Sequence, residues 1–389
     1  MRKFACLLLA LALLAPCAAR GELMDAALET APPIPLLCES AVLVEPESGQ
    51  ILFEQNADER RPVASVTKIM AILLALEALE AGRATLEDPV PVSQTAAGMG
   101  GSQVLLDAGE TLPFETLLKS MIVGSANDAT VAIGEYLYGS HQLFVDRMNE
   151  RAQELGMADT HFVNSTGLPA EGHYTTARDV ARMTVEMLKH PLYFEYSTIW
   201  LDSVIHESGR ETQLTNTNRL IRLYDGCDGG KTGSTNEAGY CISATAERGG
   251  MRLIAVVLGA QSSSDRFDTA ASMFDYGFAN YRLYPVAKSG AKIKGEMPVE
   301  GGNLPSIALM LQGDLTLLMK KGTEQSVELL PNLPQSVQAP LDMGDAVGSV
   351  DVVLDGRKIA RIAVVAAQAV GRQDFADGLR RVFGRWLFQ

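Results

Sequence analysis

The segment Pro62-Val63-Ala64-Ser65-Val66-Thr67-Lys68-Ile69-Met70 leads from a small, partly polar run into an apolar run that continues to Leu76. Such a run predicts a buried helix of about four turns, which would end near Gly82. Ser65 would lie in the first turn, with Lys68 on the same face of the helix. This spacing brings an amine within reach of a hydroxyl, so Lys68 could take the proton that makes Ser65 a nucleophile. Because a Ser-x-x-Lys pattern is expected roughly once by chance in a chain this long, the motif alone also fits a helix cap beside a solvated lysine.

The composition indicates an acidic protein with a large core. The chain has 389 residues, enough for two domains or more, of which 47% are hydrophobic, and its formal net charge is −14. A chain this acidic is a poor candidate for general nucleic-acid binding, so no nucleic-acid partner is expected. The sequence has no Cys-x-x-Cys motif and no paired histidine spacing, which disfavours a metal site.

Residues 1–19 have the pattern of a secretory signal peptide. Two basic residues precede an apolar stretch from Phe4 to Leu14, which is too short for a stable membrane anchor, and Cys17-Ala18-Ala19 offers small residues for cleavage. Acylation of Cys17, as in a lipoprotein, is an alternative that Pro16 disfavours. Cleavage would remove two basic residues and no acid, which changes the net charge from −14 to −16.

Three cysteines, Cys38, Cys227 and Cys241, lie beyond this predicted signal peptide. An odd number in a chain of this size argues against a disulfide framework. Cys227 and Cys241 flank a predicted hairpin, so a bridge between them stays open, although free buried thiols are favoured.

The order of predicted elements indicates an α+β domain over residues 36–282, preceded by a proline-rich linker at 20–35. Strands are predicted at 41–45, 50–54, 230–233, 240–246 and 252–258, and helices at 113–122, 129–138, 141–155, 176–188 and 270–281. This order predicts an antiparallel sheet that is built from both ends of the domain and has helices packed on it. Over residues 283–370, short alternating runs between Gly and Pro turns predict a small all-β sandwich domain.

Two further motifs could contribute to chemistry. Ser125-Ala126-Asn127 lies in a turn between two predicted helices, where it fits a helix cap or a hydroxyl and an amide presented to a cleft. Lys231-Thr232-Gly233 lies on a predicted strand, where it fits an ordinary surface strand or a carboxylate-binding edge. In the second case Lys231 supplies a cation, Thr232 a hydroxyl, and Gly233 a bare backbone against which a ligand strand can lie.

The three motifs, in this order and in these structural settings, resemble those of the penicillin-binding transpeptidase and β-lactamase-like superfamily. Within it, the chain resembles the low-molecular-mass penicillin-binding proteins, the serine-type D-alanyl-D-alanine carboxypeptidases, whose middle motif is Ser-x-Asn. The resemblance includes further segments of the chain: Ala64–Met70, Thr160–Asn164, Gly167-Leu168, His173, Asp225-Gly226, Ala238–Tyr240 and Gly344–Gly348. It therefore covers roughly residue 36 to the C-terminus and implies a β-lactamase/transpeptidase-like catalytic domain.

The resemblance also implies a role for each motif residue. Ser65 would be the acylated nucleophile, Lys68 its general base, and Ser125 the group that passes the proton to the leaving amine. Asn127 would hold Lys68 and the substrate amide. The terminal carboxylate would be received by Lys231 and Thr232 of the Lys231-Thr232-Gly233 motif, and the backbone N–H groups of Ser65 and Ser234 would form the oxyanion hole. In our register Thr217, and not Arg219, occupies the position of a carboxylate-binding arginine that some members have.

The implied reaction removes the terminal D-alanine from a peptidoglycan stem pentapeptide through an acyl-enzyme, without a metal or organic cofactor. β-Lactams mimic the D-Ala-D-Ala end and should acylate the same serine. A class A β-lactamase is an alternative, but it would need a Glu-x-x-Leu-Asn segment, and none occurs between Asn127 and Lys231. A non-catalytic wall-binding protein is a second alternative, which would be favoured by loss of Ser65 or Lys68.

Residues 371–389 form the last predicted element, an amphipathic helix. Large apolar side chains recur at helical spacing, among them Phe375, Phe383 and Trp386, and arginines lie off that stripe. This pattern predicts a peripheral anchor at a membrane surface, which the family often has. The alternative is a terminal helix packed on the β domain. With the signal peptide, the anchor predicts a protein at the extracytoplasmic face of the membrane, in the periplasm or cell-wall space.

Overall fold

The computed structural model describes residues 28, 31–323, 326–354 and 356–374. These residues form two compact units, one within residues 21–280 (the N-terminal unit) and one that begins at Tyr281 (the C-terminal unit). The predicted signal peptide at 1–19 lies outside the described residues, as does the predicted terminal helix beyond residue 374. Among the described residues, no helix is long and apolar enough to cross a membrane.

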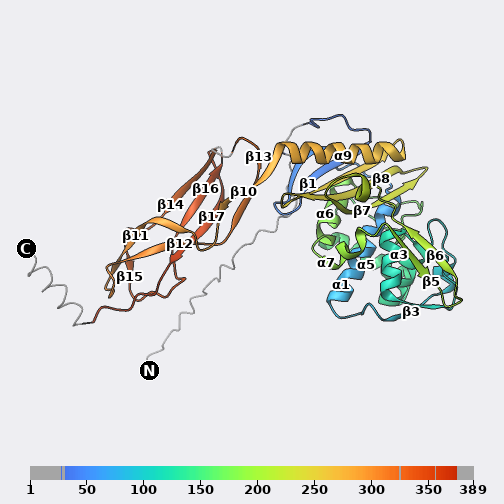
Figure 1. Ribbon diagram of the computed structural model, residues 1–389, viewed down its shortest axis with the longest axis horizontal. Helices are drawn as coiled ribbons and strands as arrows, with labels where there is room; N and C mark the ends of the chain where they lie inside the picture. Colours follow the sequence, from blue (N-terminus) through green and yellow to red (C-terminus); the bar gives the residue numbers. More distant parts are fainter. Residues whose placement is uncertain (1–27, 29–30, 324–325, 355, 375–389) are drawn as a thin grey trace, which may run out of the picture. The chain divides into compact units, whose positions relative to one another are not determined.

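The N-terminal unit is organised on a five-stranded antiparallel sheet, as the sequence predicted. Its strand order is β2 (Gln50–Gln55), β1 (Ser40–Glu45), β9 (Met251–Ala260), β8 (Gly239–Arg248) and β7 (Cys227–Thr235). The hairpin from the start of the unit therefore pairs with strands from its end, and β7 is the outer strand on one side. Helix α9 (Ser263–Asn280) covers one face of the sheet and most of the other helices lie on the opposite face (Figure 1). The sequence predicted the start of α9 at residue 270, which is seven residues too late. The helix begins earlier because Ser262 accepts a hydrogen bond from the Asp265 N–H and caps it.

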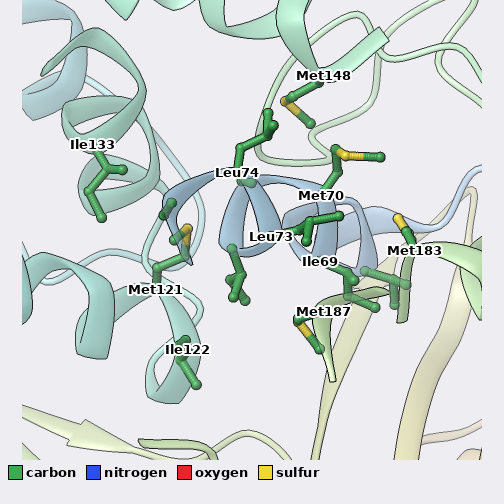
Figure 2. Packing of buried hydrophobic residues seen from close by; sticks show 14 of the residues in the cluster. Ile69, Met70, Leu73, Leu74, Met121, Ile122, Ile133, Met148, Met183 and Met187 are labelled. Atoms are coloured by element: carbon green, nitrogen blue, oxygen red, sulfur yellow. The ribbon is translucent and has the colours of Figure 1, made fainter. Parts of the chain in front are cut away.

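Helix α1 (Lys68–Glu80) is the centre of the helical layer. Its side chains are buried from Lys68 to Leu76 on every face, so it is a core helix and not an amphipathic surface helix. Ile69, Met70, Leu73 and Leu74 meet methionines and isoleucines of the surrounding helices (Figure 2). These helices are α3 (Phe114–Val123), α4 (Asn127–Tyr138), α5 (His141–Glu154) and α6 (Ala177–Met187). Their predicted positions are confirmed to within two residues at each end.

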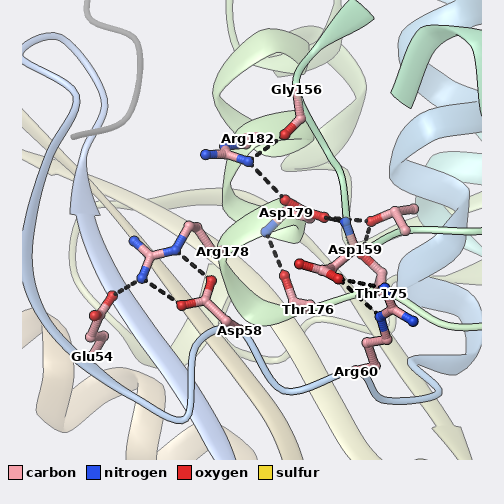
Figure 3. Close-up of polar contacts among 11 residues, drawn as sticks. Glu54, Asp58, Arg60, Gly156, Asp159, Thr175, Thr176, Arg178, Asp179 and Arg182 are labelled. Atoms are coloured by element: carbon pink, nitrogen blue, oxygen red, sulfur yellow. Dashed lines mark hydrogen bonds and ion pairs between the residues drawn. The ribbon is translucent and has the colours of Figure 1, made fainter. Parts of the chain in front are cut away.

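A polar network ties the segment before Ser65 to α6 (Figure 3). Arg178 donates to Asp58 at 2.7 Å and to Glu54 at 2.8 Å, and its own backbone N–H donates to the Ala57 carbonyl. Thr176 caps α6 by accepting the Asp179 N–H at 3.1 Å. The backbone that precedes Ser65 is therefore held against α6.

The sequence missed the short elements of this unit. They are β3 (Pro89–Pro91), α2 (Gln94–Ala97), β4 (Thr111–Pro113), α7 (Pro191–Ser197), β5 (Leu201–Ile205), β6 (Glu211–Thr215) and α8 (Leu220–Leu223). Most are shorter than the window over which hydrophobic periodicity can be recognised. The β5–β6 hairpin also keeps Leu201 and Ile205 exposed, so it lacks a simple polar-out alternation.

The C-terminal unit consists of β strands throughout its described part. Six strands pair in the order β14 (Val327–Asn332), β16 (Ala346–Leu354), β17 (Arg357–Ala366), β12 (Ser306–Gln312), β11 (Lys292–Glu300) and β15 (Val337–Gln338). A separate antiparallel pair joins β10 (Tyr281–Ala287) to β13 (Leu315–Lys320). Side chains of this pair, including Ala287 and Leu317, pack with Val352 and Ile362 of the larger sheet. This arrangement agrees with the predicted all-β domain.

The start of the predicted terminal helix is corrected by the structure. Arg372 forms an antiparallel bridge with Gly302, and the Gln373 N–H donates to the Gly301 carbonyl at 2.8 Å. These backbone groups are extended and already paired, so no helix begins at residue 371. Any helix in this stretch must begin after residue 374.

Candidate active site

Ser65 and Lys68 are in contact in the structure. Ser65 lies in a 3-10 turn (Ala64–Thr67) that leads into α1, and not in the first turn of an α-helix as predicted. Lys68 Nζ lies 2.9 Å from Ser65 Oγ and donates to the Thr166 carbonyl at 2.8 Å. The lysine is fully buried, so the alternative of a solvated side chain is wrong.

Ser125 and Lys231 form a second serine–lysine pair. Lys231 Nζ lies 2.7 Å from Ser125 Oγ and 2.9 Å from the Thr232 carbonyl oxygen, and its side chain is 1% exposed. Ser125 lies in the turn between α3 and α4 with φ at +60°, a left-handed conformation that is uncommon for a serine. Such a conformation persists only where the surroundings fix it, and here it aims the hydroxyl at β7.

Burial lowers the pKa of both lysines. The pKa of Lys68 falls well below its ordinary value because its charge is desolvated and because Lys231 is cationic, while Asp128 opposes the shift. The pKa of Lys231 falls to about 7, first through burial and then through Arg266. An amine with a lowered pKa is neutral for a larger fraction of the time near pH 7, and a neutral amine can accept a proton.

Two glycines allow other segments to approach closely the 3-10 turn that carries Ser65 (Ala64–Thr67). A side-chain carbon at Gly233 would lie 2.6 Å from the Val63 carbonyl oxygen and 2.8 Å from the Ser65 nitrogen. A side-chain carbon at Gly167 would lie 1.9 Å from the Ala64 carbonyl oxygen. Gly233 therefore has a structural function that the sequence did not reveal, because it lets β7 pack against the backbone that carries Ser65.

The loop that accepts Lys68 is held by Asn164. Asn164 Oδ1 accepts the Gly167 N–H at 2.7 Å and the Thr166 N–H at 3.1 Å, which turns the Thr166 carbonyl toward the lysine. His173 joins the same loop to the 3-10 turn that carries Ser65. Its Nδ1 accepts the Val163 N–H at 3.1 Å, and its Nε2 lies 2.9 Å from Thr67 Oγ1.

This environment determines the charge of His173. Burial, with His161 as a smaller contribution, lowers the pKa of His173 to about 4. The ring is therefore neutral at pH 7. Since Nδ1 accepts a hydrogen bond, Nε2 carries the proton and donates it to Thr67.

Asn127 makes contacts other than those that the resemblance implied. Its Nδ2 donates to the Gly100 carbonyl at 2.6 Å, whereas no hydrogen bond joins it to Lys68. Its Oδ1 is buried and has no hydrogen-bond partner among the described residues, so it is available to a ligand N–H. The neighbouring Asp128 accepts the Val104 and Leu106 N–H groups and so holds the preceding loop beside Asn127.

The residues that the resemblance assigned to the carboxylate, Lys231 and Thr232, lie on β7. Thr232 Oγ1 donates to Thr217 Oγ1 at 2.8 Å, so the residue that our register placed there is in contact with the motif. Ser234, two residues further along β7, is exposed to solvent. Arg266 Nη1 donates to the Gly233 carbonyl at 3.1 Å from α9, a contact that the sequence motifs did not indicate.

The described cysteines and a candidate metal cluster among the described residues lie apart from the two serine–lysine pairs. Cys241 pairs with Gly233 across the β7–β8 ladder while Cys227 pairs with Ala246, so the register separates the two thiols and all three described cysteines are free. Asp107, Glu110 and His206 could together hold an ion by their spacing. His206 Nδ1 already lies 3.1 Å from Glu110 Oε1, and the Arg210 guanidinium donates to the Asp107 carboxylate at 2.9 Å. The positive charge at this cluster is therefore supplied by Arg210.

Comparison with known proteins supports a relationship along most of the chain. The family model described as D-alanyl-D-alanine carboxypeptidase matches residues 27–262, and the model described as penicillin-binding protein 5, C-terminal domain, matches residues 281–372. D-alanyl-D-alanine carboxypeptidase DacF of Bacillus subtilis is 38% identical over 90% of each chain. DacA of Escherichia coli is 31% identical over 90% of this chain and 88% of its own length.

Solved structures support the same relationship. Penicillin-binding protein 5 from Haemophilus influenzae superimposes with a TM-score of 0.73 at 30% identity, covering 87% of this chain and 99% of its own. A DD-transpeptidase of Streptomyces, strain K15, covers 63% of this chain and 99% of its own with a TM-score of 0.60 at 26% identity. From these matches, the chain belongs to the D-alanyl-D-alanine carboxypeptidase family of serine peptidases, with a catalytic domain followed by a C-terminal β domain.

Proposed function

We propose that this carboxypeptidase hydrolyses the terminal D-Ala-D-Ala bond of peptidoglycan stem pentapeptides through an ester on Ser65. The observation that carries the proposal is the contact of Ser65 Oγ with Lys68 Nζ at 2.9 Å. A fully buried lysine whose pKa is lowered well below its ordinary value is suited to act as a general base. A lysine paired with a carboxylate would instead be held as a cation.

Acylation uses the first serine–lysine pair. Neutral Lys68 takes the proton of Ser65, and Oγ attacks the carbonyl carbon of the penultimate D-alanine. The backbone N–H groups of Ser65 and Ser234 stabilise the negative charge that develops on the carbonyl oxygen. The close packing of Gly233 on the Ser65 backbone supports this assignment, because it brings the two donors to the same place.

The second pair completes the step. As the C–N bond breaks, the proton that Lys68 took from Ser65 passes through Ser125 to the leaving D-alanine nitrogen, so that Lys68 becomes neutral again. Lys231 holds the Ser125 hydroxyl, because its Nζ lies 2.7 Å from Ser125 Oγ. Water then attacks the ester carbonyl with Lys68 as base. Its proton returns to Ser65 Oγ, so that the shortened peptide leaves and the enzyme is restored.

Substrate binding is assigned to the remaining motif residues. Lys231 and Thr232 receive the terminal carboxylate, and the Thr232 hydroxyl then donates to the carboxylate in place of Thr217 Oγ1. The free Asn127 Oδ1 accepts an amide N–H of the peptide. Since β7 is the outer strand of its sheet, its free edge can pair with the extended peptide. A β-lactam would enter the same site and acylate Ser65.

Mass spectrometry after treatment with penicillin tests the central assignment. The adduct should lie on the peptide that contains Ser65, and Ser65→Ala should abolish both labelling and D-alanine release. Ser125→Ala is the matched control and should keep labelling at a reduced rate. An adduct on Ser125 or Ser234 would contradict the proposal.

The location of the enzyme and the ends of the chain belong to the same proposal. A substrate in the cell wall requires an extracytoplasmic enzyme, which agrees with the secretory pattern of residues 1–19. We assign residues 20–35 to a linker, 36–282 to the catalytic domain and 283–370 to the β domain. The apolar stripe beyond residue 374 is assigned to peripheral attachment at the membrane surface.

A further inference from the structure

Two described groups hold Lys68 Nζ, and acylation changes one of them. In the free enzyme the amine lies 2.9 Å from Ser65 Oγ and 2.8 Å from the Thr166 carbonyl oxygen. The Ser65 hydroxyl can donate its hydrogen to the neutral amine, but this hydrogen is gone once Oγ carries the acyl group. Of the two partners, only the Thr166 carbonyl can then direct the amine. The orientation of Lys68 toward the hydrolytic water therefore depends on the loop that presents this carbonyl.

His141, the first residue of α5, holds this loop at the residue before Thr166. Its Nε2 lies 2.9 Å from Ser165 Oγ, and the Ser165 backbone N–H is directed at the same nitrogen at 3.5 Å. Ser165 is fully buried. Helix α5 is fixed in turn, because Phe144 and Met148 lie in the hydrophobic core. The contact therefore ties the backbone next to the Thr166 carbonyl to a rigid element.

The His141 ring is a neutral acceptor in this contact. Burial lowers the pKa of His141 below its ordinary value, with Glu135 opposing the shift, so the ring is uncharged at pH 7. Because the Ser165 N–H is directed at Nε2, this nitrogen carries the lone pair, and the Ser165 hydroxyl donates to it. A phenylalanine at this position would keep a ring and lose the acceptor, whereas the side-chain carbonyl of a glutamine could replace it.

We propose that His141 and Ser165 are positioning residues for deacylation. By fixing the Thr166 carbonyl they keep Lys68 directed at the water that hydrolyses the ester. In acylation the Ser65 hydroxyl itself provides that orientation. The inference rests on the proposed function, in which Lys68 is the base of both steps, and adds that the two steps depend on different partners of the same amine.

Two rate constants of the full-length protein test this inference. Labelling by a fluorescent penicillin gives the second-order acylation constant, and a chase with excess unlabelled penicillin gives the rate at which the label is released. His141→Phe should slow release by about fivefold, the loss expected for one hydrogen bond, and change acylation by less than about twofold. Ser165→Ala should do the same. The double variant should be no slower than either single variant, because each change breaks the same contact.

Two further variants separate positioning from stability. His141→Gln keeps an acceptor in the side chain and should restore release to within about twofold of the wild-type rate. His190→Phe replaces another buried histidine at the start of a helix, α7, and should leave both constants unchanged. Unfolded molecules do not take up the label, so a loss of folding cannot slow its release.

The outcomes separate the positioning role from the proposed function. Release at the wild-type rate from both single variants, with Ser65 labelled, would overturn the role of His141 and Ser165 while the carboxypeptidase assignment stands. Equal slowing of acylation and release would also overturn it, because the loop would then act on both steps alike. Failure of penicillin to label Ser65 in the wild-type protein would overturn the proposed function, and with it the assignment to deacylation.

Discussion

The two serine–lysine pairs of the site are alike in geometry and different in origin. Lys68 lies 2.9 Å from Ser65 and Lys231 lies 2.7 Å from Ser125, and both lysines are buried. The first pair is three residues apart within one turn, whereas the second is 106 residues apart and joins the α3–α4 turn to the outer strand of the sheet. Equal geometry thus comes once from local helical spacing and once from the tertiary fold.

The surroundings give the two pairs different chemistry. Lys68 has Lys231 as its cationic neighbour, and Lys231 has Arg266. Lys231 therefore lowers the pKa of Lys68 while lying next to the proposed carboxylate site. From this difference we expect Lys68 to act as the base and Lys231 to supply positive charge beside Ser125. Exchanging amine for guanidinium at each position tests this division.

The largest expected effect is that of Lys68→Arg. A guanidinium stays protonated, so it preserves the charge and removes the base. Acylation by penicillin should slow by roughly a thousandfold or more, which lies within the contribution of general base catalysis. Lys231→Arg keeps the charge that the second pair supplies and should slow acylation by only about ten- to a hundredfold. Stopped-flow labelling measures both, and a Lys68→Arg variant with near wild-type rates would place the base elsewhere.

The pH dependence of acylation sharpens the same comparison. A lysine is neutral above its pKa, so the rate should rise as pH increases through the lowered pKa of Lys68. Lys231 loses its charge above its pKa of about 7, so the rate should fall again at higher pH.

Lys231→Arg should move that alkaline fall to higher pH by one unit or more, because the guanidinium does not titrate there. The profile of the second-order acylation constant from pH 5 to 10 provides the measurement. An alkaline fall that is unchanged in Lys231→Arg would show that another group causes it.

A smaller effect is expected from the loop that supports only the first pair. His173→Ala would leave Thr67 without its 2.9 Å partner, at a cost of about 1 kcal/mol, or roughly a fivefold change. Acylation should slow by about that factor. The pH values at which the acylation rate rises and falls should not change, because His173 is neutral throughout the measured pH profile. His190→Ala removes another buried histidine, at the start of α7, and should lower Tm without slowing acylation. Equal slowing by both variants would mean that His173 acts only through stability.

The contrast between local and assembled features also describes what the sequence could predict. The Ser65–Lys68 pair and the strands of the five-stranded sheet follow from residue spacing, and both predictions are confirmed. The family resemblance assigned Lys231 and Ser125 to one active site but did not predict their contact, because nothing in the local pattern of either residue indicates the other.

Several site residues have no local pattern at all. The Thr166 carbonyl and the Arg266 contact to Gly233 depend on backbone groups, which every residue type carries. The close approach of Gly233 to the Ser65 backbone likewise depends on how β7 packs against the 3-10 turn that carries Ser65. Such contacts exist only after the sheet and the helical layer have come together.

The terminal stripe is the local pattern that stays a prediction, and its effect on activity should be the smallest. Phe375, Phe383 and Trp386 recur at helical spacing, and each buried side chain of this size contributes about 1.5 to 3 kcal/mol of membrane affinity before the cost of ordering the helix. Each neighbouring Arg adds about 1 kcal/mol at an anionic surface. These terms support reversible attachment, and high salt should weaken it only in part because the apolar contribution remains.

Flotation with anionic liposomes measures this attachment. Deletion of residues 375–389 keeps the described bridge between Arg372 and Gly302 and should leave the protein at the bottom of the gradient, with D-alanine release from soluble peptides unchanged. The matched variant Phe383→Ser/Trp386→Ser keeps every arginine, so it separates the apolar contribution from charge. If the full-length protein and the deletion both stay at the bottom, the stripe is not a membrane anchor. Its apolar side chains would then be expected to pack on the β domain, and the deletion should lower the Tm of that domain.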